Sequence, residues 1–151
     1  MHYSPEQLLP HAAPMILLDE IIEADQTSLR AALTVPTNGL FNDPVYNGAV
    51  PAWVGIEYMA QAVAAHAGYL SRLNGESPTI GFLLGSRLYQ SNVASFKCGS
   101  YLIVHVEEIL KGDNGMAVYQ AIIEGPGVEV SARINGFLPE NPMAFLQGNE
   151  L

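Results

Sequence analysis

Residues 52–70 read AWVGIEYMAQAVAAHAGYL and predict one long helix that is apolar on every side. A helix of this kind must be enclosed by protein or by lipid. Its first turns carry one carboxylate, Glu57, which is costly in such surroundings unless it is paired or protonated. Glu57 is therefore a candidate for either a buried structural acid or a catalytic acid.

The segments on both sides of this helix predict an antiparallel sheet. Ser4-Pro5 begins a short helix that Pro10 must end, and a loop rich in proline, glycine and asparagine fills residues 36–51. The long helix is expected to end near Asn74-Gly75. The runs with strand character are residues 15–23, 28–35, 79–90, 100–111, 116–124 and 128–138.

The order of these elements predicts an α+β domain over residues 1–151, a length that suits a single domain. An antiparallel sheet has one face to bury, and one wholly apolar helix can fill its concavity. The opposite side of the helix still needs cover. A second sheet added edge to edge would supply it, so we expect a dimer.

The charge balance excludes several classes of partner. Fifteen acidic residues against six scattered basic ones give a net charge of −9, whereas binding to nucleic acid or to an anionic membrane needs clustered Lys and Arg. Glu57, Gln61 and His66 interrupt the long helix, which favours a core helix over a membrane span. The lone Cys98 and an amino end without a basic and then apolar run predict a cytoplasmic protein.

Two motifs resemble those of the hotdog-fold 3-hydroxyacyl-ACP dehydratases of the fatty-acid type. Residues 8–20, LLPHAAPMILLDE, are similar to that family's LLPHRYPFLLVD signature, and residues 56–61, IEYMAQ, are similar to its EAMAQ motif. The likeness is greatest to the ApeP-like branch of bacterial aryl polyene synthesis, whose members work beside a second dehydratase subunit. The resemblance implies a long central helix wrapped by a curved antiparallel sheet, acyl-carrier-protein thioesters as substrates, and no cofactor.

The resemblance makes Glu57 the catalytic carboxylate, but the family's catalytic histidine is missing. In the family that histidine lies in a His-Phe-Pro-Gly loop fourteen residues before the carboxylate, a position that is Asp43 in this sequence. No histidine occurs between His11 and His66. The imidazole of the family takes a proton from C2 while the carboxylate assists loss of the 3-hydroxyl, and an aspartate is a much weaker base.

Further candidates lie around Glu57. Gln61, one helical turn later on the same face, is expected to orient Glu57. Pro51-Ala52 matches the family's Pro-Gly at the helix start, where a backbone N–H polarises the thioester carbonyl, and Ala52 retains that N–H. Asp43 is a substrate-site candidate by position, although its Asn-Asp-Pro context favours a turn or cap.

The histidines present do not replace the missing one. His66 is half a turn out of phase with Glu57 and about 13 Å further along the helix axis. His11 is expected to be structural near the mouth of the site, and His105 to be a sheet residue. Their spacing indicates no metal site.

Three functions remain open from the sequence. The first is a dehydratase subunit that is incomplete as a homodimer and gains a histidine from a partner subunit. The second is a hotdog thioesterase in which Glu57 serves as base or nucleophile beside the Ala52 N–H. The third is an acyl-binding or scaffold subunit without catalysis.

Overall fold

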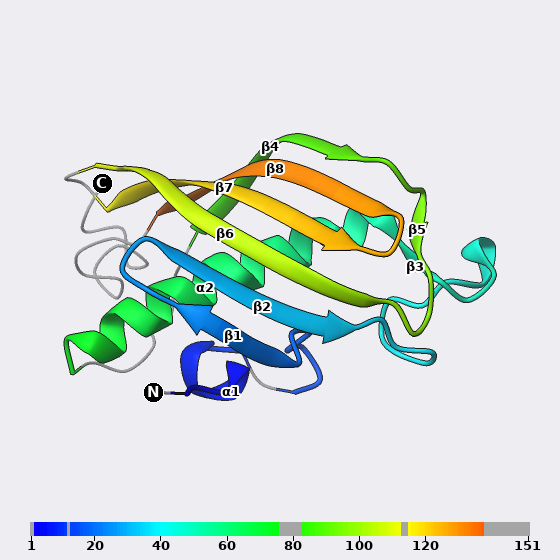
Figure 1. Ribbon diagram of the computed structural model, residues 1–151, viewed down its shortest axis with the longest axis horizontal. Helices are drawn as coiled ribbons and strands as arrows, with labels where there is room; N and C mark the ends of the chain where they lie inside the picture. The colour runs from blue at the N-terminus through cyan, green and yellow to red at the C-terminus, as the bar shows by residue number, and fades with distance from the viewer. Residues whose placement is uncertain (1, 12, 76–82, 113–114, 138–151) are drawn as a thin grey trace, which may run out of the picture.

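In this computed structural model one long helix lies across one face of a six-stranded antiparallel sheet (Figure 1). The structure describes residues 2–11, 13–75, 83–112 and 115–137. The sheet order is β1-β2-β6-β7-β8-β4. Its strands are β1 (Glu20–Ala24), β2 (Ser28–Thr34), β4 (Leu83–Ser91), β6 (Tyr101–Lys111), β7 (Met116–Gly125) and β8 (Val128–Phe137).

The remaining elements are short, apart from the long helix α2 (Gly55–Leu73). A helical turn, η2 (Ala52–Val54), leads directly into α2, so the predicted helix of residues 52–70 is present and begins with one tighter turn. The others are α1 (Pro5–Leu8), η1 (Pro44–Tyr46), β3 (Val50–Pro51) and β5 (Ser95–Phe96). The pair β3–β5 was not predicted because two residues are too few to show a strand period.

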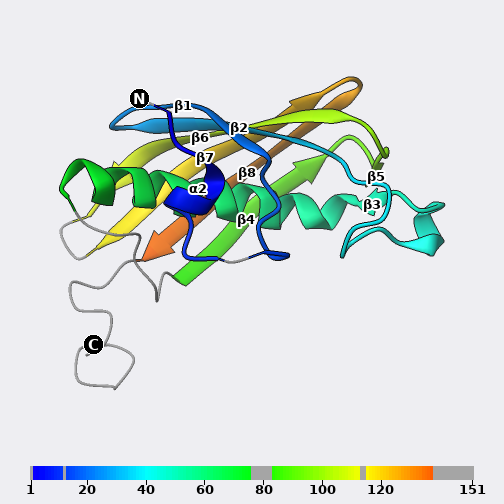
Figure 2. The same ribbon diagram turned by 90° about the horizontal axis from the view of Figure 1, so that it is seen from below.

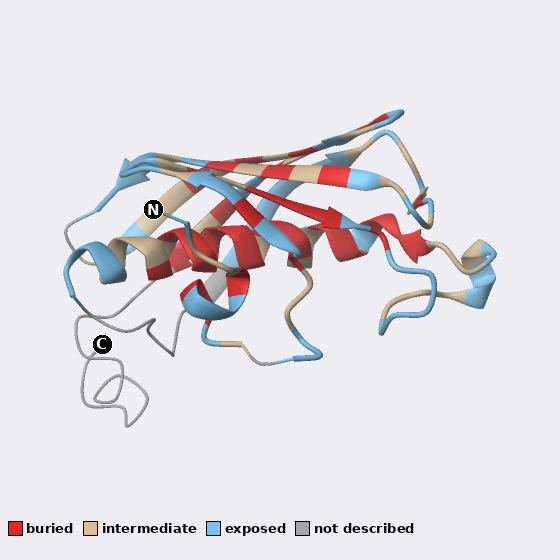
Figure 3. Ribbon diagram, turned by 60° about the horizontal axis from the view of Figure 1, so that its bottom comes forward, coloured by how far each residue is buried: buried red, intermediate tan, exposed pale blue. Residues whose placement is uncertain are grey.

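The core lies between α2 and the sheet, where buried residues of the strands face the helix (Figure 3). Burial alternates along strand β7: Tyr119, Ala121 and Ile123 are buried, whereas Ile122 is partly exposed on the other face. This arrangement confirms the predicted α+β architecture of one long helix on a large antiparallel sheet, and the sheet does not close into a barrel. No helix of the described residues is both long and apolar enough to span a membrane.

The amino-terminal helix α1 packs against the C-terminal half of α2 (Figure 2). Ser4 and Gln7 form a capping box, as the sequence indicates. The guanidinium of Arg72 donates two hydrogen bonds to the carbonyl of Gln7, at 2.9 and 3.2 Å. Gly68 lies against the backbone of Leu8, where any side chain would collide with the Leu8 carbonyl.

The first predicted strand is wrong in its first half. Residues 15–23 were expected to form it, but β1 begins only at Glu20. Residue 15 is a bend and residues 16–19 belong to no helix or strand, and the side chain of Gln61 bonds the Met15 carbonyl and the Leu17 N–H in this segment. The other strands agree with prediction within a few residues, except that residues 79–82, 113–114 and 138 lie outside the described part.

Helix α2 is not covered on every side. Trp53, just before it, has 59% of its surface exposed, and Ile56, Glu57 and Ala60 are partly exposed. These residues lie on the side of the helix that the sheet does not reach. A single chain therefore leaves exposed the side of α2 that was expected to be covered by a second chain.

Candidate active site

Glu57 is the third residue of α2, on its partly exposed face. A carboxylate in the first turn of a helix is stabilised by the helix dipole. Gln61 Nε2 donates a hydrogen bond to Glu57 Oε1 at 3.3 Å. Half-burial beside one amide donor leaves Glu57 accessible from solvent or from a partner chain, which differs from the fully enclosed acid that the apolar sequence indicated.

Gln61 is itself held firmly. Its side chain is 1% exposed, its Nε2 also donates to the Met15 carbonyl at 2.6 Å, and its Oε1 accepts from the Leu17 N–H at 2.8 Å. These two backbone bonds fix the amide plane, so the direction of the bond to Glu57 is fixed as well. This is the geometry that a positioning role for Gln61 requires.

The helical turn η2, which leads into α2, is hydrogen-bonded to β4 and to the connection between β4 and β5. The Ala52 N–H donates to the Ala94 carbonyl at 2.9 Å, and the Ala52 carbonyl accepts from the Tyr89 hydroxyl. Burial raises the pKa of Tyr89 to about 12, so its hydroxyl stays protonated and can donate. The Ala52 N–H is thus already engaged, and Ala94 would have to release it before it could bind a thioester carbonyl. Pro51 lies opposite Ser95 in the β3–β5 pair.

Asp43, which the resemblance places at the position of the family's histidine, caps the short helix η1. Its Oδ1 accepts from the Val45 N–H at 2.9 Å, and its carbonyl accepts from the Tyr46 and Gly48 N–H groups. These bonds are those of an N-cap residue. The structure therefore gives Asp43 the capping environment that its sequence context favours.

The loop around Asp43 is braced by Asn42, a residue that the sequence reasoning passed over. Asn42 Nδ2 donates to the carbonyls of Pro36 and Gly48, and its Oδ1 accepts from the Gly39 N–H at 2.6 Å. Asparagine in a Pro- and Gly-rich loop is a signal of such local bonding. The hydrogen bonds of Asn42 therefore fix the conformation of this loop, which contains no histidine.

His66 is buried and locked in a structural network. Its Nε2 lies 2.9 Å from the Asp25 carbonyl, and its Nδ1 lies 2.7 Å from the Tyr119 hydroxyl. Since a carbonyl can only accept, Nε2 carries the proton and Nδ1 accepts from Tyr119. Burial lowers the pKa of His66, which favours this neutral form.

The other described histidines do not bond Glu57 either. His105 lies opposite Ile122 of β7, on the face of the sheet away from the helix, because its neighbours Val104 and Val106 are buried. His11 has a buried Nδ1 that finds no partner among the described residues. Within those residues, no three His, Cys, Asp or Glu side chains gather into a metal site.

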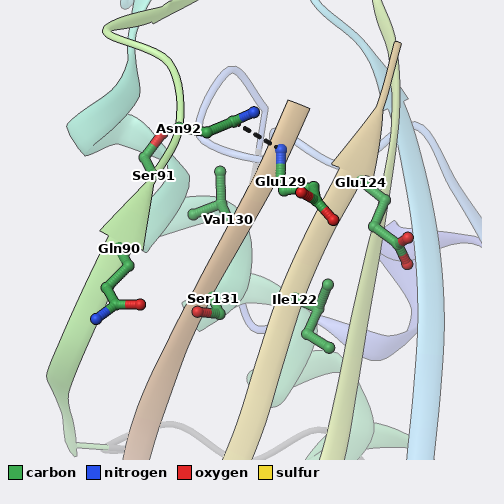
Figure 4. Close-up of a pocket in the computed structure, with 8 residues that line it drawn as sticks. All are labelled: Gln90, Ser91, Asn92, Ile122, Glu124, Glu129, Val130 and Ser131. Atoms are coloured by element: carbon green, nitrogen blue, oxygen red, sulfur yellow. Dashed lines mark hydrogen bonds between the residues drawn. The ribbon is translucent and has the colours of Figure 1, made fainter. Parts of the chain in front are cut away.

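A hollow of about 560 Å³ lies on the outer face of the sheet (Figure 4). Its walls come from β4, β7 and β8, and Glu124, Glu129 and Ser131 are among the lining residues. The residues of β7 and β8 that alternate with these three are buried and face the helix. This hollow and Glu57 are therefore on opposite sides of the sheet. The hollow is separate from the candidate active site.

Comparison with known proteins gives a family and a fold. The model of the ApeP-like family, described as ApeP dehydratase, matches residues 3–147. A chain of the dehydratase heterocomplex ApeI:P from Xenorhabdus doucetiae superposes with a TM-score of 0.86 at 26% identity, covering 99% of this chain and 100% of that one. No curated protein sequence matches significantly.

More distant structures share the hotdog architecture alone. A hypothetical thioesterase with coenzyme A from Streptococcus pneumoniae has a TM-score of 0.54 at 14% identity, covering 78% of this chain and 86% of that one. The Escherichia coli PaaI protein of the phenylacetic acid degradation operon has a TM-score of 0.53 at 12% identity, with 78% and 81% covered. Identities this low carry no inference about activity.

Proposed function

The chain belongs to the ApeP-like dehydratase family, and from this premise we propose that it is the carboxylate-bearing subunit of a two-subunit dehydratase. Its proposed substrates are 3-hydroxyacyl thioesters of acyl carrier protein, of the fatty-acid or aryl-polyene type. Its proposed partner is a second dehydratase subunit that carries the histidine. The active site would then be completed where the two chains meet.

What supports this proposal is that Glu57 has an oriented carboxylate and no imidazole bonded to it among the described residues. Glu57 is accessible and oriented by the fixed amide of Gln61. The position that should provide an imidazole provides Asp43, which is occupied as a cap. His66 faces Tyr119 and Asp25 instead. For dehydration, a site with this acid and no imidazole is complete only if another chain brings the base.

The proposed step is an elimination of water across C2 and C3. The partner's imidazole takes a proton from C2, and the electron pair of that C–H bond forms the C2–C3 double bond. The C3–O bond breaks, and the Glu57 carboxyl group gives its proton to the departing hydroxyl, which leaves as water. Transfer of the abstracted proton from imidazolium to carboxylate restores both groups.

Three features support a heterodimer over a homodimer for this function. In a homodimer both sites would pair Glu57 with Asp43, and neither would contain an imidazole. The ApeI:P relative is described as a dehydratase heterocomplex. The net charge of −9 points the same way, because acyl carrier proteins are acidic and their docking needs basic residues that a partner would have to supply.

A turnover titration tests the proposal. The partner subunit is obtained by pull-down with this chain from the native cell, and dehydration of a 3-hydroxyacyl carrier protein is followed with this chain alone, with the partner alone, and with mixtures of increasing ratio. We expect turnover by the mixture that saturates at one to one. Strong turnover by this chain alone would contradict the dependence on a partner. Thiol release by this chain alone, abolished in Glu57→Gln, would favour the thioesterase instead.

A further inference from the structure

The outer strand β4 offers a free edge to another chain. Among the described strands β4 is bonded to β8 on one side and to none on the other. Gly85, Ser86 and Arg87 are exposed along it, and the next residue, Leu88, has 69% of its surface exposed. A sheet edge of this kind pairs readily with a further strand.

Two arginines lie side by side at this edge. Arg87 of β4 is directly opposite Arg133 of β8, so both side chains point to the outer face of the sheet. Arg133 Nε donates to Gln120 Oε1 at 2.9 Å, and neither arginine forms an ion pair with a carboxylate of the described residues. Like charges directly opposite one another in a sheet are destabilising. In a chain with only six basic residues, such a pair at a free edge needs an explanation.

The position of Arg87 makes this edge a poor match for its own copy. Arg87 lies within the described part of β4, Leu83–Ser91. A second copy added antiparallel in the register centred on this residue would set its own Arg87 opposite Arg87. Four guanidinium groups would then gather on one face, and their repulsion would oppose the homodimer.

We propose that Arg87 and Arg133 select the partner at the β4 edge: they favour a subunit with a carboxylate opposite Arg87 and disfavour a second copy of this chain. This inference rests on the proposed two-subunit function and names the chemistry of its partner. A single carboxylate there meets two guanidinium groups, which is a favourable cross-strand arrangement.

The residues after Arg87 connect this edge to the candidate active site. The ladder between β4 and β8 is irregular between Arg87 and Gln90, and Leu88 there has a left-handed backbone with φ of 58°. Beyond it, Tyr89 turns inward and its hydroxyl holds the Ala52 carbonyl at the start of α2. A partner seated on Arg87 and Leu88 therefore lies two residues or fewer from the contact that anchors the helix bearing Glu57.

The first test needs only this chain. Sedimentation velocity compares the self-association of the wild type, of Arg87→Glu, and of their equimolar mixture. The mixture places opposite charges across the edge, so we expect it to associate about fivefold more tightly than the wild type does with itself. We expect 0.5 M salt to reduce this difference. The matched control is Lys111→Glu, an exposed charge reversal at the end of β6, whose mixture should show no gain. Equal association in all mixtures would overturn the proposal.

The second test uses the complex with the partner subunit. Calorimetric titration should show Arg87→Glu weakening the heterocomplex about fivefold or more, and Lys111→Glu leaving it unchanged. If the heterocomplex is unaffected while the KM for the carrier protein rises, the arginines bind the carrier instead and the proposal fails. Turnover that needs both subunits, together with a failed charge test, would refute only this inference. If Arg87→Glu weakens the heterocomplex as expected but the complex shows no turnover, the proposed function is refuted.

Discussion

Replacing Gln61 by leucine removes the side chain that joins helix α2 to the segment before β1. The variant Gln61→Leu loses the bonds to the Met15 carbonyl and the Leu17 N–H, as well as the bond to Glu57. A typical hydrogen bond contributes about 1 kcal/mol net, and the two backbone groups are only partly buried, so water can replace part of the loss. We therefore expect a loss of about 2 kcal/mol in the free energy of unfolding.

Thermal unfolding followed by circular dichroism measures this loss. For a domain of this size, about 2 kcal/mol corresponds to a fall in Tm of about 4–8 °C. The matched variant Gln61→Glu retains the oxygen that accepts from Leu17 but loses the donor to Met15, and it places a second carboxylate beside Glu57. The Tm of Gln61→Glu should fall by a similar amount at pH 7. It should recover partly at low pH, where the protonated carboxyl group of residue 61 can donate to the Met15 carbonyl. A Tm of Gln61→Leu within 1 °C of the wild type would refute the reasoning.

Three further predictions concern other parts of the chain. Gly68→Ala brings a methyl group against the Leu8 carbonyl, and we expect a loss of about 1–3 kcal/mol in urea-unfolding experiments, despite the higher helix propensity of alanine. His66 has a lowered pKa in the folded state, so its contribution to stability is complete above its unfolded pKa of about 6.5 and is lost as the pH falls toward the folded value. The pH dependence of urea unfolding between 7 and 5 should therefore be shallower in His66→Leu than in the wild type, and equal slopes would count against the buried neutral histidine. Asp43→Asn keeps an oxygen that can accept from Val45, so it should change the stability by less than about 0.5 kcal/mol and leave turnover by the two-subunit complex unchanged. A large loss of turnover in Asp43→Asn would show that Asp43 acts in the chemistry.

Most of the fold could be predicted because its signals are local and periodic. The apolar run of residues 52–70 specifies the long helix, and the runs at residues 116–124 and 128–138 specify the strands β7 and β8. The paired motifs then indicated the hotdog family, which the ApeP-like match and the ApeI:P superposition confirm. The capping box at Ser4 was readable for the same reason, since all of its atoms lie within four residues.

The parts that could not be predicted depend on contacts between distant residues. The sequence of residues 15–18 is as apolar as a strand, yet a glutamine 44 residues away takes the backbone bonds of Leu17. The Ala52 N–H is free in any local description of a helix start, and only the fold brings Ala94 within 2.9 Å of it. The wholly apolar helix sequence indicated a buried Glu57, whereas one chain supplies cover on the sheet side only.

The most direct measurement of the central claim is dehydration by the reconstituted complex in which only this chain carries Glu57→Gln. The substitution keeps the shape of the side chain but removes the proton donor, and the partner subunit is unchanged. The account predicts that turnover of the 3-hydroxyacyl carrier protein falls at least about 100-fold, the scale of a lost general acid, while the complex still forms. Turnover at the wild-type rate would mean that Glu57 takes no part in the chemistry and that this chain is a scaffold.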